Sequence, residues 1–526
     1  MKHRGFFSII LHGHLPYVRH PEHERFLEED WFYEAIEETY IPLLQVCERL
    51  LADSIDFRLT FTLSPTLVSM FEDPLLRGRA RRHLERLIEL GNREVHRTRG
   101  DATFHPLALM YRQRFGDALD YFDRYGGNLA SAFRGIADTG RVEIMTCAAT
   151  HGFLPLLASR PSSVRAQIRV GVEHHARVFG RPPAGIWLPE CGYFPGVEGV
   201  LKECGIRHFI LDTHGVLDAS VRPRYGAYAP ILCPNGVAAF GRDPDSSKQV
   251  WSAEEGYPGD FDYREFYRDI GWDLPYDYVK DYIQPDGKRK NTGLKYYRIT
   301  GKSDWKEPYV PAWAREKAAL HASNFLFFRE KQVEYYASGM RRPPVIVAPY
   351  DMELFGHWWY EGPDWLEFLL RKVAGDQDTV KTITPSEALD AFPVAQVSTP
   401  SASSWGYKGY NEVWLNGTND WVWGHVLEAS RRMEALARFH ETPSPLERRA
   451  LDQAAREILL LQSSDWPFIM KTGTMVPYAR RRVEEHLTRF LALEKAIKDR
   501  SLEERAVSRL EMQDNVFPEI DYRVFR

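Results

Sequence analysis

Two carboxylates, Glu190 and Asp351, stand where a strand-like apolar run gives way to a polar loop. Glu190 closes the run Gly-Ile-Trp-Leu-Pro-Glu, and Asp351 closes the run Val-Ile-Val-Ala-Pro-Tyr-Asp. Cleavage of a glycosidic bond needs one carboxylate to attack or steady the anomeric carbon and a second carboxyl group to protonate the leaving oxygen. These two residues are therefore the candidate pair for that chemistry.

Tryptophans cluster around the same loops. Trp358 and Trp359 lie in the loop that begins at Asp351. A solvated loop rarely carries two tryptophans and a core rarely carries several carboxylates, so the mixture suggests a binding cleft. The apolar C–H face of a sugar ring packs on indole, so a tryptophan-lined acidic cleft suits an oligosaccharide. We choose four platforms: Trp251, Trp358, Trp405 and Trp414. The alternative for each is a core position, because tryptophan is usually largely buried.

Three histidines open a competing interpretation. His12 and His14 are two positions apart on an extended segment and project to the same side. With His151 and Asp351 they form a possible ligand set for a metal that activates water. Metal sites rarely need so many tryptophans, which argues against this interpretation. Structural or hydroxyl-binding histidines are the third alternative, which we favour for His14 and leave open for His12 and His151.

Further charged residues lie near the candidate pair. Arg242, in Gly-Arg-Asp-Pro, either pairs with a catalytic carboxylate and keeps it ionised or is a surface arginine in a turn. Glu353 and Glu361 are either supporting groups or surface groups, and the sequence does not decide between these. There is no convincing phosphate-binding loop, dinucleotide fingerprint or nucleophile elbow, so no cofactor is expected.

The elements that position these residues alternate between strand and helix. Seven strand-like runs each end in polar residues, and helical segments such as 162–178 and 197–204 separate several of them. The runs are at 6–11, 57–62, 142–151, 185–193, 208–214, 345–351 and 382–386. Polar residues at the carboxyl ends of strands are typical of parallel β/α folds. The order predicts a parallel sheet that closes into a barrel, with 31–51 as its first helix.

Three departures from this alternation define the domains that we expect. Charged amphipathic segments at 66–139 predict a helical insertion within a catalytic barrel that spans 1–395. The Pro- and Gly-rich stretch 223–245 reads as a loop, and 394–404 as a linker. Beyond it, 404–526 is expected to be helical, with helices at 423–439, 446–462 and 478–498. Asp465 and Trp466 lie in a break between two of these helices and are expected to face the barrel mouth.

Composition narrows the class of protein. The chain has 526 residues and a formal net charge of -5, which argues against nucleic acid as its main partner. No segment approaches the length of a membrane span, and the apolar run at the N-terminus is too short for a signal peptide. The five cysteines are odd in number and scattered, which favours free thiols and a cytoplasmic location.

Five short motifs, taken together and in order, resemble those of glycoside hydrolase family 57, an α-glucan-active family. They cover essentially the whole chain. The motifs are His-Gly-His-Leu-Pro at 12–16, Glu-Ile-Met-Thr-Cys-Ala-Ala-Thr-His at 143–151, Gly-Ile-Trp-Leu-Pro-Glu-Cys-Gly-Tyr at 185–193, Ala-Pro-Tyr-Asp-Met-Glu-Leu-Phe-Gly-His-Trp-Trp at 348–359, and the tryptophan-rich segment 404–421.

The resemblance implies roles for the pair. By position, Glu190 is the nucleophile of a retaining double displacement and Asp351 is the general acid/base. The family also implies a distorted (β/α)7 TIM-like barrel with a helical insertion, an all-helical C-terminal domain beside the cleft, and no metal in catalysis. Expected substrate contacts are His12, His14, His151, Arg242, Trp251, His357, Trp358, Trp405, Trp414, Asp465 and Trp466.

Within the family the chain is most similar to the group of 1,4-α-glucan branching enzymes and amylase-like proteins. The resemblance implies a branching enzyme that cleaves α-1,4 bonds and forms α-1,6 bonds, with appreciable hydrolysis, and an α-amylase is the alternative. A metal-dependent barrel hydrolase and an inactive glucan-binding protein are more remote. The loop at 215–248 is shorter than in established branching members, and Tyr225 and Tyr228 are the candidates for the tyrosine of that loop.

Overall fold

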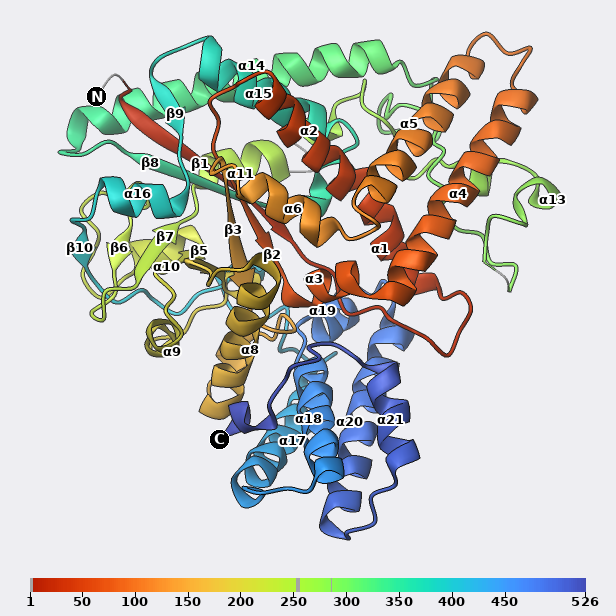
Figure 1. Cartoon of the computed structure of the whole chain (residues 1–526). Coiled ribbons are helices and arrows are strands. Elements are labelled where there is room, and N and C mark those ends of the chain that lie inside the picture. The colour runs from red at the N-terminus through yellow and green to blue at the C-terminus, as the bar shows by residue number, and fades with distance from the viewer. Residues whose placement is uncertain (1–2, 252–255, 285) are drawn as a thin grey trace.

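Seven parallel strands form the centre of the protein (Figure 1). The computed structural model describes residues 3–251, 256–284 and 286–526. In spatial order β7, β5, β4, β3, β2, β1 and β8 lie side by side, and the ring closes where the Asp243 N–H donates to the Val347 carbonyl at 2.8 Å. The fold is therefore the expected distorted (β/α)7 barrel. The strands are β1 (Gly5–Gly13), β2 (Leu59–Leu63), β3 (Val142–Cys147), β4 (Gly185–Trp187), β5 (His208–Leu211), β7 (Ala238–Gly241) and β8 (Val345–Asp351).

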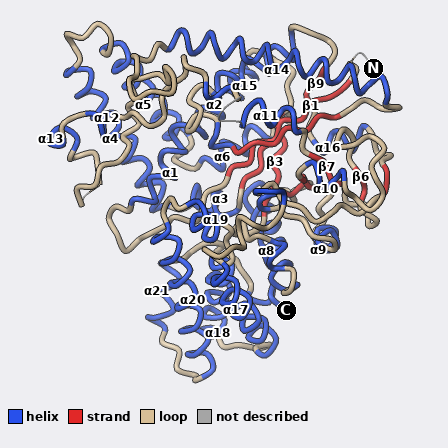
Figure 2. The backbone as a smooth tube through the Cα atoms, turned by 180° about the vertical axis from the view of Figure 1, so that it is seen from behind, coloured by secondary structure: helices blue, strands red, loops and turns tan. Residues whose placement is uncertain are grey.

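The barrel strands are apolar because helices cover their outer face and side chains fill the interior. In β8, Val345 and Val347 point into the barrel beside Ile10 and Phe240, whereas alternate residues such as Ile346 pack outward against the helices. Figure 2 shows the strands as a curled band surrounded by helices. Both faces of each strand are thus buried, which explains the continuous apolar runs in the sequence.

Two expectations about connecting segments were wrong. The stretch 223–245 is not a plain loop, because it contains β6 (Ile231–Leu232) and the sixth barrel strand β7, which pair antiparallel. The stretch 394–404 is not a free linker, because β10 (Gln396–Val397) pairs with β6. The strands β6 and β10 are each only two residues long and lie among proline, glycine and serine, so their sequences show no strand periodicity.

The remaining strand, β9 (Val380–Thr382), lies beside the N-terminal half of β1. It is followed by α16 (Pro385–Ala391), which begins with a capping box in which Thr384 and Glu387 each accept from the other's backbone N–H. The strand expected at 382–386 therefore lies earlier, at 380–382, and the capped helix follows it as expected.

The first helix after β1 is interrupted by a π-helical segment. The region 31–51, expected as one helix, consists of α1 (Asp30–Ala35), the π-helical segment Ile36–Tyr40 and α2 (Ile41–Ala52). Such segments often occur at functional sites. Here it directs Glu38 and Tyr40 toward the loop after β8, where they accept from His357 and donate to Glu353, respectively.

The other helices of the barrel region include one that the sequence patterns did not indicate. The 29-residue helix α14 packs against α15 and β1. The expected helices at 162–178 and 197–204 are present as α8 and α9. The helices of this region are α7 (Leu154–Leu157), α8 (Pro161–Phe179), α9 (Val197–Glu203), α10 (Thr213–Leu217), α11 (Pro244–Trp251), α12 (Ile270–Asp273), α13 (Tyr276–Val279), α14 (Pro311–Gly339) and α15 (Gly362–Gly375).

Four helices lie between β2 and β3, and two of them project from the barrel as an antiparallel pair, α4 and α5 (Figure 1). The segment that contains α13 lies against this pair, where Arg93 stacks on Tyr278 at 4.6 Å. The four helices are α3 (Pro65–Glu72), α4 (Pro74–Arg97), α5 (His105–Arg124) and α6 (Leu129–Ala137).

The C-terminal part of the chain is a helical bundle below the barrel, drawn in blue in Figure 1. The break between α18 and α19 places Ser464 and Asp465 against the barrel, where the Ser464 N–H donates to the His151 carbonyl at 3.0 Å. No helix in the described part of the chain is both long and apolar enough to cross a membrane. The bundle comprises α17 (Asp420–Phe439), α18 (Pro445–Leu461), α19 (Asp465–Thr472), α20 (Val476–Lys498) and α21 (Glu504–Gln513).

Candidate active site

A cavity of about 840 Å³ opens at the carboxyl ends of the barrel strands. It brings together Glu190 and Asp351 with nine of the eleven other candidate residues. Parts of the barrel loops and of the C-terminal bundle form its wall, so both halves of the chain contribute. The cavity is lined by His12, His14, Leu15, His151, Glu190, Arg242, Val250, Trp251, Pro258, Asp351, Glu353, Leu354, Trp358, Trp405, Gly406, Tyr407, Val413, Trp414, Asp465 and Phe468.

The backbone at Glu190 is strained. Glu190 and the next residue, Cys191, have φ angles of 62° and 51°, in the left-handed region that residues other than glycine rarely adopt. Such strain costs on the order of 1–3 kcal/mol per residue and persists only where the surroundings enforce it. Here the Trp405 N–H donates to the Glu190 carbonyl at 2.9 Å. The strained turn directs the carboxylate into the cavity.

Two hydrogen bonds hold the Glu190 carboxylate. Trp405 Nε1–H donates to Oε2 at 2.8 Å, and the Ser464 hydroxyl donates to Oε1 at 3.1 Å. Burial raises the pKa of Glu190, and the Asp465 charge adds to this, while the two hydrogen bonds and the nearby His14 act in the opposite direction. Both oxygens are thus oriented, and the donors favour the ionised form that a nucleophile requires.

Asp351 has the opposite surroundings. It ends β8 beside His12 of β1, which is its register partner. Its carboxyl group makes no hydrogen bond or ion pair with any residue in the described ranges. Burial, with the charges of Glu353 and Glu190, raises its pKa well above the ordinary value, and only Arg242 opposes the shift. A carboxyl group that faces the cavity without a partner and keeps its proton to higher pH is suited to donate that proton to a leaving oxygen.

A chain of side-chain hydrogen bonds links β2 to Glu190. Thr62 Oγ1 lies 2.8 Å from His12 Nδ1, His12 Nε2 lies 3.0 Å from His151 Nε2, and His151 Nδ1 lies 2.8 Å from Ser464 Oγ. Burial lowers the pKa of both histidines well below the ordinary value, so each is neutral and carries one N–H. Because the Ser464 hydroxyl donates to Glu190, the donors must run in one direction, from Thr62 to the carboxylate.

His14 lies in a different electrostatic setting. Its Nε2 lies 3.1 Å from Oδ1 of Asp465, and its Nδ1 lies 2.9 Å from Ser64 Oγ. Burial alone would lower its pKa, but the charges of Asp465, Glu190 and Glu353 raise it above the ordinary value. The pair of His14 and Asp465 therefore joins the barrel to the C-terminal bundle at the cavity wall.

Glu353 is a part of the site that sequence reasoning left undecided. It lines the cavity, and its Oε1 accepts from the Tyr40 hydroxyl at 2.5 Å and from the His14 N–H at 3.1 Å. Burial raises its pKa to about 7. Its position two residues after Asp351 was the one available signal. Thr62, Ser64 and Ser464 carried no signal, because each acts through a partner distant in sequence.

The tryptophans divide into platforms and core. Trp251 and Trp358 line the cavity with 38% and 55% of their surfaces exposed, and Trp358 stacks on Phe266 at 4.4 Å. Trp405 also lines the cavity, through the side chain that binds Glu190. Trp414 is only 1% exposed and stacks on Phe153, so it supports the wall and offers no open face.

Two of the expected substrate contacts do not line the cavity. Trp466 is fully buried in the bundle, and its Nε1–H donates to the Leu460 carbonyl at 2.8 Å. His357 does not line the cavity, because its Nδ1 pairs with Oε2 of Glu38 at 2.5 Å. Each residue is adjacent in sequence to a cavity residue, but the helical turn in one case and the loop in the other direct the side chain away.

Arg242 is neither a surface residue nor in contact with Asp351. Its guanidinium lies 5.7 Å from the ring of Trp405 and 3.7 Å from Asp212, while Nε donates to Ser247 at 2.6 Å. Arg242 therefore acts on Asp351 through charge at the cavity wall.

The loop tyrosines lie elsewhere. Tyr228 stacks on Tyr336 and donates to Asp243, and neither it nor Tyr225 lines the cavity.

The four residues that could have bound a metal do not all lie together. His12 and His151 come together, with Cys147 as a third group whose atoms all lie within 4.8 Å of one another. Asp351 and His14 do not belong to this cluster, and His14 directs its two ring nitrogens to Ser64 and Asp465. The four residues expected from spacing therefore do not form one coordination site among the described residues.

Two known sequence patterns and several known proteins match this chain. The sequence pattern described as glycosyl hydrolase family 57 matches residues 8–400, and that of the C-terminal region of 1,4-alpha-glucan branching enzymes matches residues 425–525. A branching enzyme from Thermococcus kodakarensis is 34% identical, and the match covers 98% of this chain and 77% of that protein. A probable branching enzyme from Mycobacterium tuberculosis is 32% identical over 99% of this chain and 98% of that protein.

Two solved structures, an α-amylase and a branching enzyme, superimpose on the whole chain. The α-amylase AmyC from Thermotoga maritima superimposes with a TM-score of 0.93 at 45% identity, over 99% of each chain. A branching enzyme from Pyrococcus horikoshii superimposes with a TM-score of 0.89 at 32% identity, over 99% of this chain and 97% of that one.

Proposed function

The chain belongs to glycosyl hydrolase family 57, and on this premise we propose that it is a retaining enzyme of α-1,4-glucans that makes α-1,6 branches, with appreciable hydrolysis. The observation that carries the chemistry is the contrast between two carboxyl groups in one cavity. Glu190 is held by two donors, whereas Asp351 is unengaged and has a strongly raised pKa. Such a difference separates a nucleophile from an acid.

The reaction proceeds in two displacements. A Glu190 oxygen attacks the anomeric carbon, the bond to the leaving O4 breaks, and Asp351 gives its proton to that oxygen. The product is a glucosyl ester on Glu190. Asp351, now ionised, takes the proton of an acceptor hydroxyl as that oxygen attacks the anomeric carbon and releases Glu190. A glucan 6-hydroxyl as acceptor gives a branch, and water gives hydrolysis.

The substrate that fits this cavity is an α-glucan chain. Trp251 and Trp358 offer exposed indole faces to sugar rings, while His12, His151 and the pair of His14 and Asp465 provide polar groups for hydroxyls near Glu190. In this scheme Trp405 orients the Glu190 carboxylate, Arg242 acts on Asp351 through its charge, and neither has a direct role in bond cleavage.

The C-terminal match favours branching, and one structural observation favours the alternative, an α-amylase. Residues 425–525 match the branching-enzyme C-terminal region. However, Tyr228 is packed against Tyr336, so it does not cover the acceptor side of the cavity. Access of water to the glycosyl-enzyme sets the balance between transfer and hydrolysis. AmyC, at 45% identity, is named as an amylase.

We further propose a division of the chain into a barrel at 1–395, a helical insertion at 66–139 and a C-terminal domain at 404–526. The two family patterns, at 8–400 and 425–525, support it. The five cysteines are all free, which supports the proposal of a cytoplasmic location.

Incubation with amylose tests the activity. New α-1,6 anomeric protons, counted by NMR, report branching, and new reducing ends report hydrolysis. We expect both, with branches in excess. Reducing ends without branches would make the protein an amylase. No turnover of any α-glucan by the wild type would indicate a glucan-binding protein, and the Glu190→Gln variant serves as the inactive control.

A further inference from the structure

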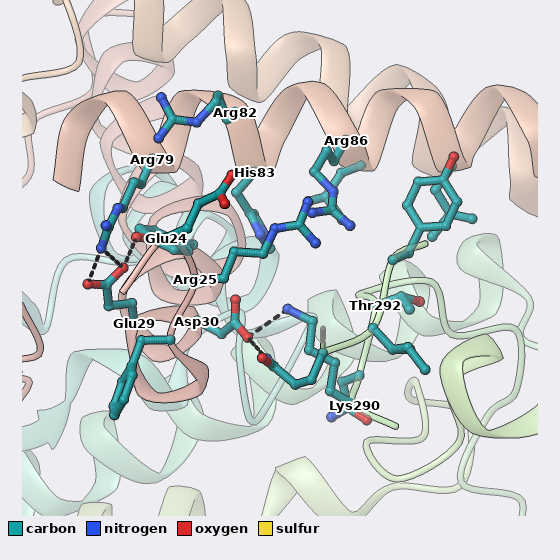
Figure 3. A pocket seen from close by; sticks show the side chains of 18 residues that line it. Glu24, Arg25, Glu29, Asp30, Arg79, Arg82, His83, Arg86, Lys290 and Thr292 are labelled. Carbon is teal, nitrogen blue, oxygen red and sulfur yellow. Dashed lines mark hydrogen bonds and ion pairs between the residues drawn. The ribbon is translucent and has the colours of Figure 1, made fainter. Parts of the chain in front are cut away.

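A second cavity, of about 240 Å³, lies between helix α4, the segment at 24–33 and residues 282–284 and 290–292 (Figure 3). It shares no lining residue with the catalytic cavity. Five cationic side chains line it: Arg25, Arg79, Arg82, Arg86 and Lys290. We call it the cationic pocket.

Two of its three carboxylates are already engaged. Glu29 accepts from Arg79 at 2.6 and 2.8 Å, and Asp30 accepts from Lys290 at 2.6 Å (Figure 3). Glu24 is exposed and makes no hydrogen bond or ion pair with the described residues. Five positive charges therefore face three negative ones, and the pocket has a net positive charge.

Three of the five cations, Arg25, Arg82 and Arg86, have no carboxylate partner among the described residues. Figure 3 shows the side chains of Arg25 and Arg86 in the pocket, one from the segment before α1 and the other from α4, and the charge of Arg25 acts on Arg86. Arg25 has no hydrogen-bond or ion-pair partner in the described part of the chain. Arg86 donates to the Asp281 carbonyl and stacks on Tyr282 at 5.8 Å, but no described carboxylate pairs with it. Burial and the charge of Arg25 lower its pKa.

Two guanidinium groups without a carboxylate between them repel each other, and an anion between them would remove this repulsion. Guanidinium is planar and donates two parallel N–H groups, so it matches the oxygens of phosphate or carboxylate. His83 lines the same pocket and is neutral, because burial with the charges of Lys290 and Arg86 lowers its pKa to about 3. It leaves a further N–H available as a donor.

The rest of the lining limits the size and type of ligand. Leu87 and Ile283 contribute a small apolar surface. The volume of about 240 Å³ is below the roughly 300–1,000 Å³ of sites for drug-sized molecules, so the pocket fits a compact ligand better than a nucleotide sugar or an oligosaccharide. A doubly charged group joined to a small organic part matches both the cationic and the apolar lining.

We propose that the cationic pocket binds a compact organic phosphate monoester, with its phosphate between Arg25 and Arg86 and its organic part over Leu87 and Ile283. Two guanidinium groups match the two charges of a phosphate monoester. This inference does not rest on the proposed function, because the pocket is separate from the catalytic cavity.

Titration calorimetry of the whole protein at low ionic strength tests the proposal, with ribose 5-phosphate as the probe and ribose and inorganic phosphate as comparisons. We expect ribose 5-phosphate to bind more tightly than inorganic phosphate, and ribose not to bind. Arg25→Met and Arg86→Met keep the aliphatic stem and should each weaken binding at least about ten-fold, as expected for the loss of a charge-assisted hydrogen bond.

Arg81→Met is the matched control. Arg81 lies on the same helix, pairs with Asp123 at 3.0 Å and does not line the pocket, so its variant should bind as the wild type does. Activity on amylose should be unchanged in all three variants. If Arg86→Met fails to fold, the exposed Arg25 decides through its own variant.

Three results would overturn the proposal. The first is no binding of ribose 5-phosphate at concentrations up to about 10 mM. The second is equal binding to wild type and to Arg25→Met. The third is equal affinity for ribose 5-phosphate and inorganic phosphate, which would mean an adventitious ion only.

Discussion

Trp405 and Glu190 are joined by two hydrogen bonds, one from indole Nε1 to carboxylate Oε2 at 2.8 Å and one from the Trp405 N–H to the Glu190 carbonyl at 2.9 Å. The two residues are 215 positions apart in the sequence. The segment between barrel and bundle thus fixes both the strained backbone and the carboxylate of the proposed nucleophile. Loss of the indole donor should therefore affect the ionisation of Glu190 directly.

Trp405→Phe should shift the acidic limb of the pH profile of kcat/KM to higher pH. The bond to Oε2 favours the ionised carboxylate, so its loss raises the pKa of Glu190, and the nucleophile becomes active only at higher pH. A hydrogen bond to a charged group is worth about 1.5–3 kcal/mol, which corresponds to a shift of about 1–2 pH units. Trp421→Phe, outside the cavity, is the control. An unshifted limb would show that the indole does not control the ionisation.

Asp351→Asn should lower kcat by about 10²–10⁴, as expected for a lost general acid. It should also stabilise the protein at neutral pH. The pKa of Asp351 is raised in the folded state, so the folded state retains a proton that the unfolded state loses above about pH 4. Wild-type stability therefore falls as pH rises above that value, whereas asparagine does not titrate. Urea unfolding at pH 4 and pH 7 should show an advantage of the variant at pH 7 only; equal differences at both pH values would contradict the raised pKa.

The sequence was sufficient to predict the site residues that lie at the ends of strands. Glu190 and Asp351 follow apolar runs, and parallel strands bring such ends to one edge of a barrel. Trp414 and Trp466 show the limit of this reasoning. Both lie in the expected segments, but burial depends on contacts with Phe153 and the bundle core, which no local pattern contains.

The sequence patterns did not predict the strand β6 or the helix α14, and the reasons differ. The strand β6 has two residues, too few for a period, and it is recognisable only through its partners β7 and β10. The helix α14 has 29 residues, but its apolar residues are spread around the helix and form no single stripe, so the expected 3.6-residue pattern is absent. In both cases tertiary packing, and not local sequence, determines the element.

Thr62→Val should reduce kcat/KM by about two- to ten-fold, with Thr62→Ser close to wild type. The Thr62 hydroxyl lies 2.8 Å from His12 Nδ1 and begins the chain of hydrogen bonds that ends at Glu190. Valine has the same shape but cannot donate, so the direction of the chain is lost at the cost of about one hydrogen bond, 0.5–1.5 kcal/mol. Steady-state kinetics on amylose measures the effect. Equal losses in the valine and serine variants would indicate a packing role for Thr62 instead.

Trp358→Ala should raise KM for long glucans by about 5–30-fold and leave kcat nearly unchanged. Its indole is 55% exposed at the cavity and is held by stacking on Phe266, which makes it a rigid platform for a sugar ring. Contacts that are equal in the ground state and in the transition state change KM alone, and a loss of 1–2 kcal/mol corresponds to this factor. Trp313→Ala, similarly exposed but outside the cavity lining, is the matched control. A fall in kcat without a change in KM would assign Trp358 to the chemical step.

Gly356→Ala should destabilise the protein and reduce activity together. Gly356 has φ of +107°, and a Cβ there would lie 1.8 Å from the Glu38 carbonyl oxygen. Backbone strain alone costs about 1–3 kcal/mol, and the clash would also push the loop after Asp351 away from the π-helical segment. Gly375→Ala is the matched control, because it has open space around its Cβ position and should have little effect or stabilise slightly. Urea unfolding and amylose turnover of both variants measure the difference. Equal stability of the two variants would show that the loop can move without loss, and that its contact with Glu38 does not position Asp351.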